Sequence, residues 1–330
     1  MRTGQNPAKS IEYVPQPQRV TVALISYIPF MKGYYSNSLD VLNVCLKSIK
    51  NNTKIPYDLL VFDNGSCREV KEHLKNAQQN GDIQYLVLSD RNIGKAGAWN
   101  FIFGSAPGEL IAYSDADIYH YPGWLSALIQ VYETFNNIGM VTGIPMWSPE
   151  EFSTSTIDWA QDNPKVNIEY GAFLPWEDYW RHARSLGHTA QKARTHFEKC
   201  KEYVIEYQDL KCYAGAGHFQ FLAPTDALRS VLPIPSQRPM GQVRLLDKSL
   251  NDRGYLRLST DKWWVQHLGN SLLSIEMQNV QAEHEIPGIS EITANQQPYQ
   301  MNKVWIWNIK PVRRFLQWVH GATFEILYRS

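Results

Sequence analysis

The hydrophobic and polar positions up to residue 145 follow two alternating patterns. Short continuous apolar runs, the first at 20–28 and stopped by Pro29, are typical of strands that are buried on both faces of a sheet. Segments with apolar residues at helical spacing, such as 39–49, lie between these runs. The pattern predicts strands at 20–28, 57–62, 83–88, 110–113 and 138–144, and helices at 39–49, 96–103 and 124–135, with a charged helix after the turn at 63–66.

Strands that alternate with helices predict an α/β fold, in which helices flank a mostly parallel sheet. Right-handed crossovers place the C-terminal ends of parallel strands at one edge, where such sheets bind ligands. Three of the predicted strands end in polar segments at 26–27, 63–65 and 114–117. We therefore expect a ligand site at this edge.

The regular alternation ends after Pro145. We expect a charged helix over 177–203, a strand over 212–223, a short helix over 245–254 that carries Asp247, and a strand over 263–268 that ends in His267. Residues 1–18 are polar and carry Pro and Gln, which predicts a disordered tail. The chain thus divides into segments 1–18, 19–145, 146–270 and 271–330.

The segment 304–328 mixes apolar, aromatic and basic residues. Several of them fall near one helical face: Phe315, Leu316, Val319 and Leu327, with Arg313 and Arg314 nearby and Trp305, Trp307 and Trp318 interspersed. This composition favours a helix that lies on a membrane surface or packs against a partner subunit in a homo-oligomer. A helix docked on its own domain is the alternative. No apolar run reaches the roughly 18 residues that span a bilayer.

Composition narrows the possible classes of protein. The formal net charge is zero, which excludes a general polyanion binder and sets nucleic acid aside as a partner. The four cysteines show no metal-ligand spacing and are typical of reduced thiols in a cytoplasmic protein. Eleven Trp and 18 Tyr residues are compatible with sugar-stacking surfaces, although aromatic side chains more often form core.

The clearest candidate chemistry is the pair Asp115 and Asp117, directly after a buried strand. Carboxylates at i and i+2 of an extended segment point the same way and can share a hard divalent cation. Such a cation, Mn²⁺ or Mg²⁺, would bridge the diphosphate of a bound nucleotide. The alternative is a solvated turn.

Other candidates follow the remaining strands. Asp63 is either part of an ordinary turn or a carboxylate that accepts hydrogen bonds from a base or ribose. The segment 92–100 opens a helix with small residues, so its backbone could approach a ligand and Lys95 could reach phosphate; plain helix–sheet packing is the alternative. His267 and Asp247, taken singly, are equally compatible with structural roles.

Taken together, these segments resemble family 2 glycosyltransferases with the GT-A fold, a Rossmann-like α/β architecture. The resemblance covers about 20–270 and rests on the order and spacing of the strand at 20–28, the turn 63–66, Asn92-x-Gly94-x-Ala96-x-x-x-Asn100, the segment 114–117, Asp247-x-x-Leu250, Gly254-Tyr255 and His267-x-Gly269. It departs from the family at Leu246, where a Glu usually precedes the Asp, and in the short helix after it. The stretch 147–213 is longer than a minimal member needs and would be specific to the acceptor.

The resemblance implies an inverting transfer of a sugar from a UDP- or GDP-sugar to a carbohydrate or other hydroxyl acceptor. By it, 19–145 is the nucleotide-sugar half, 146–270 the acceptor and catalytic half, and 271–330 an extension. Asp63 would hold the base, and Asp115 the ribose and also the metal. Asp117 and His267 would ligate the metal, and Asp247 would be the general base. The donor site would comprise Tyr27, Asp63, Asn92, Gly94, Lys95, Asn100 and Asp115.

Two other readings remain. A sugar nucleotidyltransferase would need a Gly-rich basic loop after the first strand, but 26–30 holds no glycine. An inactive sugar-nucleotide-binding scaffold would not need Asp115, Asp117, Asp247 and His267 together. Acceptor stacking is a further possible role of Trp147, Trp159, Trp176, Tyr179 and Trp180.

Overall fold

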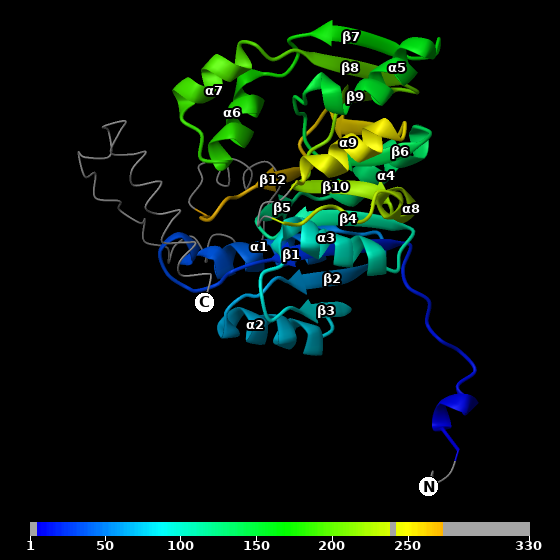
Figure 1. Cartoon of the computed structure of the whole chain (residues 1–330), viewed down its shortest axis with the longest axis vertical. Helices are drawn as coiled ribbons and strands as arrows, with labels where there is room; N and C mark the ends of the chain where they lie inside the picture. Colours follow the sequence, from blue (N-terminus) through cyan, green and yellow to red (C-terminus); the bar gives the residue numbers. More distant parts are fainter. Residues whose placement is uncertain (1–4, 238–241, 273–330) are drawn as a thin grey trace, which may run out of the picture. The chain divides into compact units, whose positions relative to one another are not determined.

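A computed structural model describes residues 5–237 and 242–272 of the chain (Figure 1). The helix expected over 304–328, with its membrane or subunit contact, lies outside the described residues. Segment 5–18 is largely exposed and contains one 3₁₀ turn, Pro7–Ser10. Within the described part of the chain, no helix is both long enough and apolar enough to cross a membrane.

A ten-stranded mixed sheet forms the centre of the fold (Figure 1). From one edge to the other, its strands are β3 (Tyr85–Leu88), β2 (Tyr57–Asp63), β1 (Val20–Ser26), β4 (Leu110–Asp115), β10 (Gln220–Pro224), β6 (Ile138–Thr142), β11 (Leu256–Thr260), β9 (Leu210–Ala214), β8 (Glu202–Tyr207) and β7 (Asn167–Gly171). The first four pair in parallel, and β6 pairs in parallel with β11. The remaining pairings are antiparallel. The predicted α/β class is confirmed, with antiparallel strands added in the second half.

Helices cover both faces of this sheet because its strands are apolar on both sides. On one face, Val22 and Leu24 of β1 join a core with residues of α1 (Ser38–Asn52), α2 (Arg68–Gln79), α4 (Trp124–Thr134) and α5 (Thr154–Asp162). On the other face, Ala23 joins a core with residues of α3 (Gly94–Ser105), α8 (Thr225–Ser230) and α9 (Arg244–Asp252). Successive residues of a strand thus serve opposite cores, as strand geometry requires.

The second half departs from two sequence predictions. The helix expected over 177–203 is instead α6 (Trp176–Ser185), α7 (Ala190–Phe197) and the start of β8. The break falls at Gly187, whose φ of +77° ends a right-handed helix. The strand expected over 212–223 is divided between β9 and β10, which have different neighbours in the sheet. Gly215, with φ of +111°, lies at that break.

A two-stranded sheet beside the main one was not predicted as such. It pairs β5 (Ile118–His120) with β12 (Val265–His267) in antiparallel register, with His267 opposite Ile118. The backbone N–H of Leu268 also donates to the carbonyl of Asp117 at 2.8 Å. Further 3₁₀ turns are Gly33–Tyr35 and Glu150–Phe152. The small sheet therefore brings the end of the second half to the carboxylates that follow β4.

Candidate active site

A cavity of about 540 Å³ opens beside the C-terminal end of β4. Its walls come from both halves of the described chain. Five of the predicted donor, metal and base residues line it: Lys95, Asp115, Asp117, Asp247 and His267. Further residues of the cavity wall include Met146, Trp147, Tyr179, His182, His218 and Phe219.

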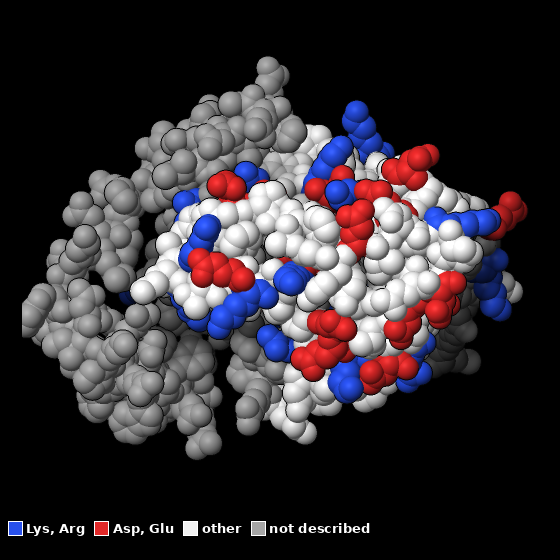
Figure 2. All heavy atoms as spheres, turned by 90° about the horizontal axis from the view of Figure 1, so that it is seen from above, with Lys and Arg blue, Asp and Glu red and all other residues white. Residues whose placement is uncertain are grey.

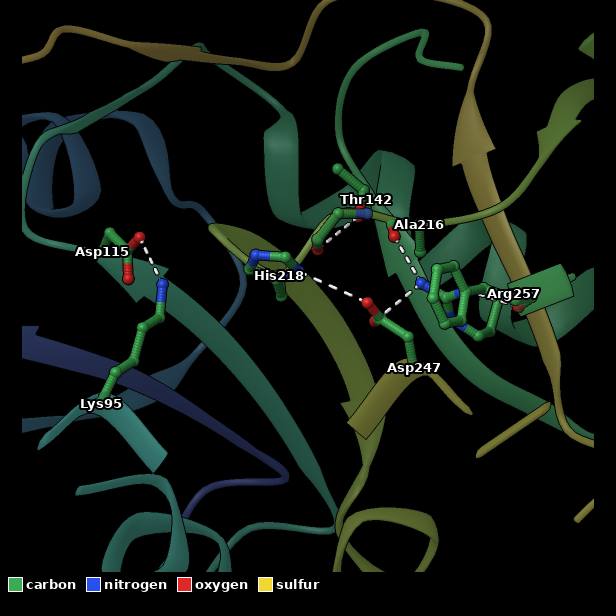
Figure 3. Close-up of polar contacts among 9 residues, drawn as sticks. Lys95, Asp115, Thr142, Ala216, His218, Asp247 and Arg257 are labelled. Atoms are coloured by element: carbon green, nitrogen blue, oxygen red, sulfur yellow. Dashed lines mark hydrogen bonds and ion pairs between the residues drawn. The ribbon is translucent and has the colours of Figure 1, made fainter. Parts of the chain in front are cut away.

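Asp115 is held by two side chains rather than facing a solvated turn. Lys95 Nζ lies 2.6 Å from Asp115 Oδ2, with the lysine side chain 13% exposed (Figure 3). The Tyr113 hydroxyl donates to Asp115 Oδ1. Burial raises the pKa of Tyr113, and the neighbouring charge of Asp115 raises it further. The phenol therefore stays protonated and serves as a donor, leaving a lysine–carboxylate pair at the cavity wall.

Asp117 pairs with His267. The distance from His267 Nε2 to Asp117 Oδ2 is 3.2 Å. Burial alone disfavours the charge on either group, but their mutual attraction and hydrogen bond outweigh it, so the pKa of Asp117 is lowered and the pKa of His267 is raised. Asp117 Oδ1 and His267 Nδ1 are buried without a hydrogen-bond partner in the described structure. The pair thus retains unused ligand capacity beside the cavity.

These two residues suit a divalent cation better than the predicted set of three. A carboxylate and an imidazole that face each other can share a metal once the proton between them is lost, and Asp117 Oδ1 is an oxygen without a partner. Asp115, in contrast, is engaged by Lys95 and Tyr113. No group of three or more His, Cys, Asp or Glu residues arranged to hold a metal ion occurs among the described residues.

Asp247 lies deep in the opposite wall, on the first turn of α9. Arg257 Nη2 donates to Asp247 Oδ1 at 2.7 Å, and His218 Nδ1 lies 3.4 Å from Asp247 Oδ2 (Figure 3). The Arg257 side chain is only 1% exposed, and burial lowers its pKa against the opposing effect of Asp247. The two side chains thus form a buried ion pair in the cavity wall.

The remaining predicted donor residues lie outside the cavity wall. Asp63 is fully buried at the end of β2, where it accepts from Ser26 Oγ and from the backbone N–H of Ser66, each at 3.1 Å. Asn92 Oδ1 accepts from the N–H of Gly94 at 2.7 Å, which begins α3. These contacts stabilise the turns at the sheet edge.

Two more predicted donor residues contact other parts of the protein outside the cavity wall. Both ends of the Asn100 amide bond the backbone of Ile234, each at 2.7 Å. The ring of Tyr27 packs edge-on against Tyr35. The structure therefore separates a cavity set of five residues from a supporting set at the same sheet edge.

The predicted aromatic residues divide in the same way. Trp147 and Tyr179 line the cavity. Trp159 packs in the core against Phe135 and Tyr207, and Trp176 stacks on Trp180 at 5.8 Å between ring centroids, away from the cavity wall.

Sequence reasoning missed His218, Arg257 and His182. The available signal for His218 was the small-residue run 214–217 before it, which lets the chain bend at a sheet end. His182 is buried in the cavity wall, and burial lowers its pKa to about 3, so this imidazole is neutral. No local sequence pattern distinguished Arg257 from an ordinary polar residue of a strand.

Charge on the surface is mixed. On the face shown in Figure 2, acidic and basic side chains are interspersed, and the described part of this face carries no extended basic area. This distribution agrees with the formal net charge of zero.

Comparison with known sequences matches one segment of the chain to a family model. Residues 35–187 match the model of glycosyl transferase family 2, which confirms the resemblance that the motifs predicted. An uncharacterized glycosyltransferase of Nostoc sp. (strain PCC 7120) is 25% identical over 134 residues. That alignment covers 40% of this chain and 41% of the relative, so the chain spans about two fifths of the relative's length.

Comparison with solved structures gives several matches, each with a TM-score below 0.5. A mannosyltransferase from Pyrobaculum calidifontis, in complex with GDP-Man and Mn²⁺, is 14% identical with a TM-score of 0.48, covering 87% of this chain and 68% of that one. GalNAc-T7 with UDP, GalNAc and Mn²⁺ is 14% identical with a TM-score of 0.47, covering 76% and 43%. TarS 1–349 of S. aureus is 11% identical with a TM-score of 0.43, covering 75% and 59%.

Proposed function

We propose that this chain, whose residues 35–187 belong to glycosyl transferase family 2, transfers a sugar from a nucleotide-sugar donor to an acceptor hydroxyl. One observation carries the proposal. A single cavity at the sheet edge gathers the Lys95–Asp115 pair, the Asp117–His267 pair and the buried Asp247. An inactive scaffold has no use for three separate charged groups around one cavity.

The donor diphosphate would lie at the end of β4. Lys95 has a compact positive charge there, and Asp117 and His267 line the same cavity. Lys95 would exchange its bond to Asp115 for one to phosphate, which frees the Asp115 carboxylate for the ribose. Asp63, Asn92, Gly94, Asn100 and Tyr27 would shape the turns on which a uracil or guanine base rests.

Asp117 and His267 would hold a divalent cation, Mn²⁺ or Mg²⁺. When bound, such an ion neutralises negative charge that develops on a departing diphosphate. The ammonium group of Lys95 would also neutralise charge on the departing diphosphate. A fixed cation at the leaving group stabilises the transition state more than the ground state.

The reaction would be a single displacement with inversion. The acceptor oxygen forms a bond to the anomeric carbon while the bond from that carbon to the phosphate oxygen breaks. The proton of the acceptor hydroxyl is removed at the cavity wall that contains Asp247, and Asp247 is the general base in this proposal. Asp247 suits this role because the hydrogen bond from Arg257 holds its carboxylate in place, and because it lies in the same cavity as the donor-side residues.

A panel of nucleotide sugars tests the proposal. Thermal unfolding is followed with UDP- and GDP-sugars, with Mn²⁺ or with a chelator, and the stabilising donor is then incubated with hydroxyl acceptors. We expect one donor class to raise Tm, and a glycosylated product to form with it. Stabilisation with neither transfer nor donor hydrolysis would identify a binding scaffold instead. No stabilisation by any nucleotide sugar would overturn the proposal.

A further inference from the structure

Asp247 is enclosed on the side that faces the protein. Arg257 binds its Oδ1 and also donates to the carbonyl oxygens of Ala216, at 2.6 Å, and of Phe152. These bonds fix the guanidinium and, through it, the carboxylate. The Asp247 side chain is only 6% exposed, so little of it is available to a ligand.

His218 occupies the cavity side of the same carboxylate. Its Nδ1 lies 3.4 Å from Asp247 Oδ2, and its side chain is 35% exposed against 6% for Asp247. In Figure 3 the imidazole of His218 lies between the Lys95–Asp115 pair and Asp247. A hydroxyl that approaches the donor-side residues therefore meets His218 before it meets Asp247.

The contact with Asp247 favours one tautomer of His218. Nδ1 is the ring nitrogen that lies 3.4 Å from the carboxylate, which accepts hydrogen bonds only, so the neutral imidazole with its hydrogen on Nδ1 is the favoured form and presents a lone pair on Nε2. A carboxylate beside an imidazole in this arrangement also stabilises the imidazolium that forms when Nε2 takes a proton. The side chains of Arg257, Asp247 and His218 thus lie in series, in that order, from the protein interior to the cavity.

We propose that His218 Nε2 is the atom that accepts the proton of the acceptor hydroxyl, and that Asp247 acts through it as a positioning residue. This inference rests on the proposed sugar transfer and refines its base. The O–H bond of the acceptor breaks as the N–H bond on Nε2 forms, while the oxygen bonds to the anomeric carbon and the nucleoside diphosphate leaves. The imidazolium then releases its proton to water when the product departs.

The test compares the purified full-length chain with His218→Ala, His218→Gln and a matched control, His73→Ala, on α2. Transfer rate, acceptor KM and donor affinity are measured on each preparation, with and without added imidazole. We expect kcat to fall by roughly 10²–10⁴-fold in both His218 variants, with donor affinity retained. Free imidazole should restore His218→Ala at least about tenfold, and it should not restore Asp247→Asn.

The double variant His218→Ala/Asp247→Asn shows whether the two residues act together or independently. If Asp247 acts through His218, the double variant is about as slow as the slower single variant. Losses that multiply, or a His218→Ala rate within about threefold of the wild type, would overturn the role of His218 while leaving the proposed transfer intact. A wild-type chain that transfers no sugar from any donor would overturn the proposed function, and this inference with it.

Discussion

His267 Nε2 lies 3.2 Å from Asp117 Oδ2, although the two residues are far apart in the chain. The antiparallel pairing of β12 with β5 brings them together, and Leu268 fixes the register through its bond to the Asp117 carbonyl. The segments 19–145 and 146–270 thus meet in an ionic contact beside the cavity.

The first prediction concerns this pair as a metal site. Excess chelator should abolish transfer, and Mn²⁺ or Mg²⁺ should restore it. Titration calorimetry should detect Mn²⁺ binding to the wild type and a loss of at least about tenfold in affinity in Asp117→Ala, because one of two protein ligands is gone. Asp162→Ala, an exposed position on α5, is the control. Full turnover in excess chelator would contradict the site.

The second prediction concerns Asp247. Asp247→Asn keeps size and polarity but removes the charge, so transfer should fall by roughly 10²–10⁴-fold while donor affinity survives. Both quantities are measured on one preparation, with Asp252→Asn on the exposed end of α9 as the control. A near-normal rate would remove Asp247 from the mechanism. Loss of donor affinity together with rate would instead show a structural role.

The third prediction concerns the stability supplied by Arg257. Arg257→Met leaves the Asp247 carboxylate buried without its cation, which should lower the free energy of unfolding by about 3–5 kcal/mol. Urea unfolding followed by circular dichroism measures the loss. Arg253→Met, at the exposed residue that follows α9, should change the free energy of unfolding by less than about 0.5 kcal/mol. Equal effects from the two variants would contradict the buried pair.

The fourth prediction is a pH dependence from His120. This imidazole is fully buried beside Trp124 and Ser48, and burial lowers its pKa to about 3. Between that pH and about 6.5, the ordinary value, the unfolded chain binds a proton that the native chain does not. Because the unfolded state binds more protons there, native stability falls as the pH falls, by about 1.4 kcal/mol per pH unit.

The His120→Gln variant removes this titration. The stability advantage of the wild type over the variant should therefore shrink as the pH is lowered from 7 to 5. Urea unfolding at pH 7, 6 and 5 measures the difference, with His73→Gln on α2 as the control. A difference that stays constant across this range would mean that His120 accepts a proton in the native protein.

The sequence by itself determined most of the parallel part of the fold. Continuous apolar runs predicted the strands β1, β2, β4 and β6, because a strand buried on both faces leaves a local signal that needs no partner. Asp63 and Asp115 could be placed at one sheet edge for the same reason, since parallel strands share the direction of their C-terminal ends.

Only the tertiary structure decided what each charged side chain contacts. Only one residue separates Asp115 from Asp117 in the sequence. Asp115 nevertheless pairs with Lys95, whereas Asp117 pairs with His267. The split of 177–203 and the enclosure of Asp247 by Arg257 and His218 likewise depend on β8–β11, which add to the sheet out of sequence order. Periodicity records the burial of a segment, whereas ionic partners follow from long-range strand order, which leaves no local pattern in the chain.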